Sequence, residues 1–312
     1  MARAYRPLDG VLLFDKPLEL SSNIALQKVR RLFQAEKAGH TGTLDPLATG
    51  LLPVCFGEAT KFSNALLDAD KSYRATVRLG QTTATGDAEG EVLVEREVTA
   101  TLDQVRAVLA QFRGAIQQLP PMHSALKHQG KPLYEYIRNG ETVHRELRDV
   151  VIHELVLHRF SDAELDISVR CSKGTYIRTL GEDIGAALGC GAHLTALRRT
   201  AIAHFDLQAG HTLAQLGDMS EAERAACLLP VDSLLPTMPR LNLDAMQIKR
   251  MAQGQRLGLD TGLPDGRVSL YGAQGFVGVG LLQGRRLAPE RLLSGVAKQA
   301  ATTTADTGTD SP

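Results

Sequence analysis

Tryptophan is absent from this chain of 312 residues, and aromatic residues make up only 4% of it. The core must therefore be built mostly from aliphatic side chains. Hydrophobic residues account for 43% and charged residues for 22%, which is typical of an ordinary globular protein. The length is sufficient for one large domain together with a small one.

An excess of charge is also absent, since 35 basic residues balance 35 acidic ones. A net charge of zero argues against indiscriminate binding to nucleic acid but permits a local basic patch. No stretch approaches the roughly 20 apolar residues of a membrane span, and the N-terminus has no apolar signal core. We therefore expect a cytoplasmic protein that does not associate with membranes.

Cysteine is scarce, and no two cysteines form a Cys-x-x-Cys pair, which argues against a structural zinc site. Two of the four lie in apolar strand patterns, where cysteine behaves as a small core residue. We predict neither a disulfide nor a metal site. The four residues are Cys55, Cys171, Cys190 and Cys227.

The most informative segment, residues 39–50, reads GHTGTLDPLATG. Its glycines permit tight turns, and Pro46 disfavours a helical conformation for Asp45, so the segment presents one carboxylate on a shaped loop. A P-loop, a dinucleotide fingerprint, G-x-S-x-G and H-E-x-x-H are all absent. These observations favour a reaction without cofactor at Asp45, although an Asp-Pro pair can also simply cap a turn.

Hydrophobic periodicity predicts both strands and helices, without a strict βαβ repeat. An α+β domain on an antiparallel or mixed sheet is therefore expected. We predict strands at residues 10–14, 51–56, 73–79, 165–171, 267–271 and 276–281, and helices at 22–36, 58–68, 175–188 and 244–253. A further helix begins at a capping box formed by Thr101 and Gln104, with Leu102, Val105, Leu109 and Phe112 on its buried face.

The composition of the chain changes near residue 230, where three prolines in ten residues indicate a linker. We predict a catalytic domain over residues 1–236 and a small, mostly β module over residues 237–296. Residues 297–312 contain no apolar pattern and are predicted to be a disordered tail.

Three further residues are candidates for a site. Tyr73 shares a strand face with apolar residues, so a core tyrosine is as good an interpretation as a site residue. Tyr176 and Arg178 follow a glycine turn at the start of a helix, where Tyr176 could stack on a base and Arg178 could pair with Asp45. Alternatively, Arg178 forms a weak surface pair with Glu182.

Residues 113–148 are rich in arginine, lysine and histidine, with two interleaved tyrosines. Such a segment suits a phosphate backbone with splayed bases, although a charged run is more often a solvated face. Arg198 and Arg199, and Arg285 and Arg286 in the C-terminal module, could extend this basic surface.

Five motifs occur in the order seen in the TruB family, the bacterial tRNA pseudouridine synthases that act on the T-loop uridine. The resemblance extends over roughly residues 8 to 290, and the set of motifs is highly specific. The motifs are Asp15-Lys16-Pro17, the loop at 39–50, Lys71-Ser72-Tyr73, Pro120 to Ala125, and Gly174-Thr175-Tyr176-Ile177-Arg178.

The resemblance implies a pseudouridine synthase core with a mixed sheet and a central active-site cleft, followed by a PUA-like RNA-binding module. It implies isomerisation of uridine 55 in tRNA without metal or cofactor, and an insertion at residues 120–150 that clamps the T-arm. It also assigns site residues. By this resemblance, Asp45 is the nucleophile and Arg178 pairs with it, while Tyr73 stacks on the base and assists removal of the C5 proton. His40 fills the gap left by the flipped base, and Tyr176 and Leu197 line the uracil pocket. Lys16 and Pro17 support the active-site loop.

The residue types suit this chemistry. Flipping the uridine costs a few kcal/mol, which an aromatic platform and a wedge residue offset. A carboxylate can trap or stabilise oxocarbenium character at C1′, while attack at C6 or proton abstraction from C2′ are alternatives. Arg178 is expected to keep Asp45 ionised.

Two other functions remain open. The chain could be the catalytic subunit of a guide-RNA complex, although such subunits lack the long clamp. It could also be an RNA-binding or tRNA-folding protein in which catalysis is secondary. We expect a monomer with no obligate protein partner.

Overall fold

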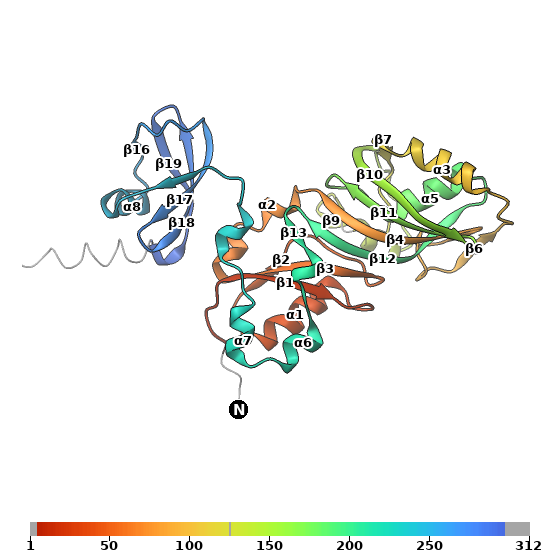
Figure 1. Cartoon of the computed structure of the whole chain (residues 1–312), viewed down its shortest axis with the longest axis horizontal. Helices are drawn as coiled ribbons and strands as arrows, with labels where there is room; N and C mark the ends of the chain where they lie inside the picture. The colour runs from red at the N-terminus through yellow and green to blue at the C-terminus, as the bar shows by residue number, and fades with distance from the viewer. Residues whose placement is uncertain (1–4, 125, 297–312) are drawn as a thin grey trace, which may run out of the picture.

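The computed structural model describes residues 5–124 and 126–296, and the predicted tail at 297–312 lies outside them. A ten-stranded sheet forms most of the molecule, and a five-stranded sheet, drawn in blue in Figure 1, lies at one end. No helix of the described part is long and apolar enough to cross a membrane. The expected α+β architecture with a mixed sheet and a C-terminal β module is confirmed.

The large sheet has the order β14-β1-β3-β12-β4-β11-β10-β7, with β2 beside β3 and β13 beside β12. Two of its pairings are parallel, β1 with β14 and β12 with β3, and the others are antiparallel. Its strands are β1 (Gly10–Lys16), β2 (Ala38–His40), β3 (Ala48–Phe56), β4 (Lys71–Leu79), β7 (Gly114–Gln118), β10 (Arg148–Ser161), β11 (Glu164–Cys171), β12 (Ala192–Ile202), β13 (Phe205–Asp206) and β14 (His211–Thr212).

The remaining elements are short strands and helices around these sheets. The C-terminal sheet contains β15 (Arg240–Asn242), β16 (Leu257–Gly258), β17 (Gly266–Gly272), β18 (Gly275–Gln283) and β19 (Arg286–Leu292), while β5 (Gln81–Thr83) pairs β6 (Val92–Glu95) and β8 (Lys127–His128) pairs β9 (Lys131–Pro132). The α-helices are α1 (Ser22–Leu32), α2 (Asn64–Leu67), α3 (Leu102–Gln111), α4 (Leu133–Arg138), α5 (Ile177–Ala187), α6 (Leu213–Asp218), α7 (Glu221–Ala226) and α8 (Ala245–Ala252). The 3-10 helices are η1 (Gly57–Lys61), η2 (Leu207–Ala209) and η3 (Val231–Leu234).

Local sequence signals locate several of these elements correctly. Thr101 and Gln104 form the predicted capping box of α3, and Asp244 and Gln247 form another at the start of α8. The helix predicted at 22–36 ends at Leu32. The helix predicted at 58–68 is instead η1 followed by α2. Leu102, predicted on the buried face of α3, is exposed because it lies in the first turn, beyond the packed part of the helix.

The strand β12 joins the two halves of the large sheet, and it was not predicted. It lies between β3 and β4, which belong to different hydrophobic clusters. One cluster packs β4, β10 and β11 against α3 and α5, and the other packs β1 and β3 against α1. Tyr73 and Leu197 contact both clusters, so these two residues mark the boundary between the halves.

The C-terminal module packs directly on the core. Val279 of β18 belongs to the same buried cluster as Val11 and Leu51 of the large sheet. The rings of Phe62 and Phe276 meet edge to face with centroids 5.4 Å apart. The proline-rich linker is packed as well, since Leu234 is buried in this cluster.

Gly50 allows β12 and the Asp45 loop to approach closely. It has a φ of +100°, and a Cβ atom at this position would lie 2.3 Å from the carbonyl oxygen of Arg199. We expect Gly50→Ala to lower the free energy of unfolding by at least about 3 kcal/mol, because backbone strain and overlap act together. Urea unfolding of the purified variant measures this loss.

The matched control is Gly140→Ala, because Gly140 also has a positive φ, +75°, but has nothing within 4 Å of the added Cβ. There the cost should be only about 1–2 kcal/mol, from the backbone conformation alone. Equal losses in the two variants would show that the close approach at Gly50 does not matter.

Candidate active site

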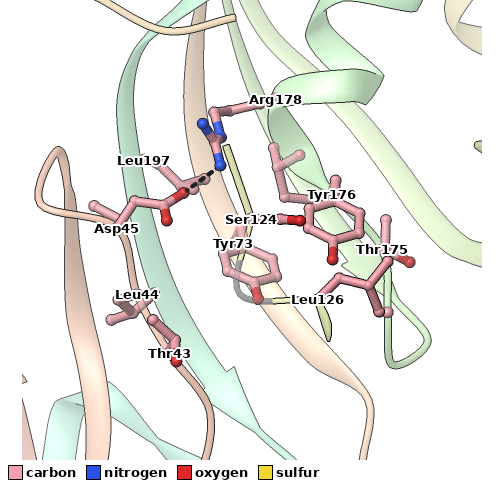
Figure 2. Close-up of a pocket in the computed structure, with 13 residues that line it drawn as sticks. Thr43, Leu44, Asp45, Tyr73, Ser124, Leu126, Thr175, Tyr176, Arg178 and Leu197 are labelled. Atoms are coloured by element: carbon pink, nitrogen blue, oxygen red, sulfur yellow. Dashed lines mark ion pairs between the residues drawn. The ribbon is translucent and has the colours of Figure 1, made fainter. Parts of the chain in front are cut away.

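A pocket of about 310 Å³ opens at the boundary between the two halves of the sheet (Figure 2). It brings together five of the residues predicted from the sequence: Asp45, Tyr73, Tyr176, Arg178 and Leu197. Thr43, Leu44, Ser124 and Thr175 also line it, although none of them was predicted as a site residue. These neighbours come from the Asp45 loop, the segment after β7 and the turn before α5.

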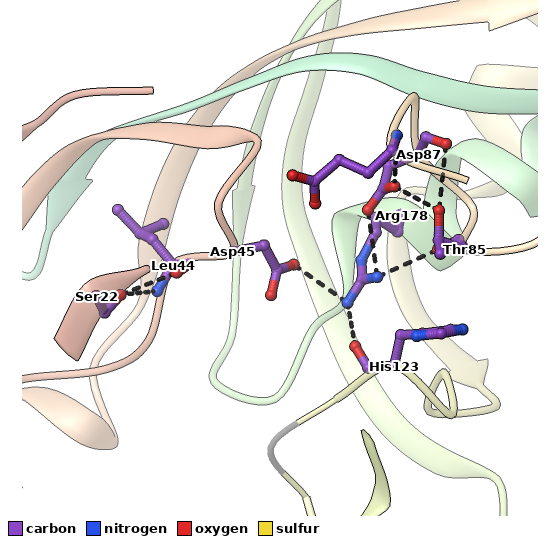
Figure 3. Close-up of polar contacts among 8 residues, drawn as sticks. Ser22, Leu44, Asp45, Thr85, Asp87, His123 and Arg178 are labelled. Carbon is purple, nitrogen blue, oxygen red and sulfur yellow. Dashed lines mark hydrogen bonds and ion pairs between the residues drawn. The ribbon is translucent and has the colours of Figure 1, made fainter. Parts of the chain in front are cut away.

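The Asp45 loop is held from both sides. The hydroxyl of Ser22, at the start of α1, accepts from the Leu44 amide at 2.7 Å and donates to the Leu44 carbonyl at 2.9 Å (Figure 3). On the other side, the buried ammonium of Lys16 donates to the carbonyl oxygens of Leu20 at 2.6 Å and Pro46 at 3.5 Å. The residues immediately before and after Asp45 are therefore anchored, which limits the movement of its carboxylate.

Arg178 lies between two carboxylates. Its Nη2 is 3.1 Å from Oδ2 of Asp45, and its Nη1 is 3.3 Å from Oδ2 of Asp87 (Figure 3). The guanidinium also donates to the carbonyl oxygens of Thr85, at 3.1 Å, and His123. The side chain is only 7% exposed, so Arg178 is a fixed partner of Asp45 and does not pair with Glu182 on the surface.

Asp87 is the component that the sequence did not reveal. Its side chain is 2% exposed, and its Oδ1 accepts from the Thr85 hydroxyl and, at 3.1 Å, from the Glu89 amide. Residues 82–90 around it are rich in Thr, Asp and Gly, a composition that indicates a loop and no particular site. No local pattern shows that this aspartate pairs with a guanidinium 91 positions away, which it shares with Asp45.

The Asp45 side chain is 40% exposed and lines the pocket. Burial raises its pKa; Arg178 opposes this effect, Asp87 adds to it, and Lys16 and His123 lower the pKa again. The expected influence of Arg178 is present but smaller than that of burial. Burial thus makes the ionised form of Asp45 less stable than it would be in water, which favours nucleophilic attack by its carboxylate.

Two aromatic side chains shape the pocket. Tyr73 extends from β4 and Tyr176 from the residue before α5. The Gln118 side chain of β7 fixes Tyr176 by accepting from its amide at 2.9 Å and donating to its carbonyl at 3.2 Å. With Leu197 between the halves, the pocket offers the flat, mostly apolar surfaces that a planar base requires.

The other predicted site residues lie outside this pocket. Lys16 and Pro17 line a second hollow with Asp15 and Thr49. Lys16 acts on the site by holding Pro46 and through its charge, which lowers the pKa of Asp45. Burial lowers the pKa of Lys16 to about 8, against the raising effects of Asp45 and Glu89. His40 lies on β2, where its Nδ1 is buried without a hydrogen-bond partner.

The predicted basic surface needs one correction. Arg199 is 1% exposed and cannot contribute to any surface, because β12 is a central strand. Arg198 is partly exposed and its guanidinium forms two hydrogen bonds with Asp15, at 3.1 and 2.6 Å. Within the described residues, no group of three or more metal-ligating side chains occurs.

Comparison with protein families matches three consecutive parts of the chain. Residues 30–177 match the TruB family pseudouridylate synthase N-terminal domain. Residues 178–236 match the tRNA pseudouridylate synthase B C-terminal domain. Residues 239–293 match the C-terminal part of pseudouridine synthase II TruB.

Curated relatives are similar over nearly the whole chain. The tRNA pseudouridine synthase B of Ralstonia nicotianae is 57% identical, over 92% of this chain and 95% of the relative. That of Methylobacillus flagellatus is 55% identical, over 93% and 97%. Among solved structures, a chain of a Cbf5-Nop10-Gar1 complex is 26% identical, with a TM-score of 0.69 over 91% of this chain and 84% of that one.

Proposed function

Because the chain belongs to the TruB family of pseudouridine synthases, we propose that it isomerises uridine 55 in the T-loop of tRNA to pseudouridine, with Asp45 as the nucleophile. The relatives named tRNA pseudouridine synthase B share more than half of their residues with this chain. The observation that supports the role of Asp45 is its ion pair with Arg178 in a pocket lined by two tyrosines.

The reaction requires the target base to leave the RNA stack and enter the pocket. Asp45 then attacks, at C1′ or at C6, the N-glycosidic bond breaks, and the uracil turns so that C5 replaces N1. Arg178 keeps the carboxylate oriented from a fixed position. Tyr73, Tyr176 and Leu197 hold the detached base between the two halves of the sheet.

Recognition of the RNA is proposed to involve two further parts. Residues 120–150 clamp the T-arm, with a cation such as Lys131, which lies 4.7 Å from the centroid of the Tyr136 ring, facing the phosphates. The module at 237–296, PUA-like and separate from the catalytic part at 1–236, adds a second RNA-binding surface. We also propose that His40 fills the gap left by the flipped base, and that the protein is a cytoplasmic monomer.

The test is release of tritium from a tRNA transcript labelled at C5 of uracil, using the purified protein alone. We expect one equivalent per tRNA, and none from a transcript with cytidine at position 55. If the protein alone released no tritium and required added guide RNA or another protein, the proposal would be overturned and a subunit of a larger complex favoured. Binding of tRNA without release would favour a folding or binding protein.

A further inference from the structure

The guanidinium of Arg199 is buried without a carboxylate beside it. No ion pair found among the described residues includes Arg199. Its Nε donates to the carbonyl oxygen of Leu51 at 2.7 Å, and its Nη2 donates to that of Gly42 at 3.2 Å. Burying a cation without a counter-ion costs several kcal/mol, so a role for the charge is expected.

Tyr73 is the neighbour that could use this charge. Arg199 and Tyr73 are direct partners across the antiparallel pairing of β12 and β4, so their side chains lie on the same face of the sheet. Arg198 and Arg74, the adjacent pair, face the other side. Arg199 also acts electrostatically on Tyr73, whose ring lines the pocket.

We propose that Arg199 is a positioning residue that serves as the counter-ion for negative charge on the Tyr73 oxygen while the C5 proton is removed. The inference rests on the proposed function and on the role that the resemblance to the TruB family implies for Tyr73, which is to assist removal of the C5 proton. The contact with Gly42 adds a second effect, since Gly42 lies in the Asp45 loop. One buried cation thus contacts both Tyr73, the proton acceptor, and the loop that bears the nucleophile.

The phenol of Tyr73 first gives its proton to water and becomes a phenolate beside Arg199. After C5 has bonded to C1′, the bond between C5 and its hydrogen breaks, and the proton passes to the phenolate oxygen. The electron pair stays in the ring as the C5–C6 double bond, and N1 takes a proton from water. No oxidant or reductant is needed.

The surroundings make the cation necessary. Burial raises the pKa of Tyr73, and Arg199 lowers it, while Cys171 and Asp45 raise it. A phenolate in this pocket would therefore be rare without Arg199. The other titratable groups that interact with the pair or with Arg199 are His40 on β2, Lys16 on β1 and Lys71 on β4.

The test is Arg199→Met, which removes the charge and keeps the bulk. Single-turnover rates are measured with tRNA that carries hydrogen or deuterium at C5 of the target uracil. We expect the rate to fall at least about tenfold, the equivalent of one pKa unit. The ratio of hydrogen to deuterium rates should rise above that of the wild type, because C5 proton removal becomes slower. Arg199→Lys should recover part of the rate.

A purely structural role would lower the rate without raising the isotope ratio, and that result would overturn the inference. Arg74→Met is the matched control, since it removes a neighbouring arginine on the opposite face, and it should leave the isotope ratio unchanged. Arg199→Gln, whose amide can still donate to a carbonyl but has no charge, replaces Arg199→Met if the latter does not fold.

Tyr73→Phe separates this inference from the proposed function. Full activity of Tyr73→Phe would remove Tyr73 from the proposed mechanism. A raised isotope ratio in Tyr73→Phe but not in Arg199→Met would refute the role of Arg199 and leave the proposed function intact.

Discussion

Asp45→Asn should reduce single-turnover release of C5 tritium at least about a thousandfold, because an amide cannot act as the nucleophile. Binding of tRNA should be retained, since the Asp45 side chain is one small part of the pocket. The exposed Asp103 provides the matched control, and Asp103→Asn should turn over at the wild-type rate. Substantial release by Asp45→Asn would remove Asp45 as the nucleophile.

Asp45→Asn should lower activity but should not lower the stability of the fold. The folded-state pKa of Asp45 is raised, chiefly by burial, so the folded protein holds this proton more tightly than the unfolded chain does. The contribution of Asp45 to stability is therefore lost as pH rises from the ordinary aspartate range through the raised pKa. At neutral pH, Asp45→Asn should unfold at an equal or higher urea concentration than the wild type, and the wild-type rate should fall on acidification before an ordinary aspartate would protonate.

Arg178→Met should harm both activity and stability. Breaking a buried ion pair by removing one partner costs about 3–5 kcal/mol, because the remaining charge is left unpaired. Here Asp87, which is 2% exposed, would lose its cation, and Asp45 would lose the group that orients it and lowers its pKa. We expect turnover to fall about a hundredfold or more and urea unfolding to show the loss in free energy.

Arg106→Met is the comparison for this experiment, since Arg106 also pairs with an aspartate but is 64% exposed. Its loss should cost less than about 1 kcal/mol and leave turnover unchanged. If Arg178→Met behaved like Arg106→Met, the arrangement of one guanidinium between two carboxylates would contribute neither to turnover nor to stability.

The parts of the fold and of the site that could be predicted from sequence are those determined by neighbours in the chain. The Asp45 loop combines glycines, a proline and one acid within twelve residues, and the capping box of α3 requires only two residues three positions apart. These features need no knowledge of distant segments, and the structure contains them.

The parts that could not be predicted depend on pairing between distant segments. The strand β12 contains two arginines and two irregularities in its pairing with β4, so its sequence, AHLTALRRTAI, shows no clean alternation. Arg199 was therefore considered a possible extension of the basic surface, although it is buried. Asp87 was missed for a related reason, since only the fold brings it to Arg178.

The shared cluster of Val11, Leu51 and Val279 also fixes where the C-terminal module lies relative to the pocket. The C-terminal module cannot swing away without exposing these side chains to water, an unfavourable change. The distance between the pocket and the outer end of the module is thus constant. If the module binds RNA as proposed, an RNA arm that contacts both the pocket and the module must match this fixed distance.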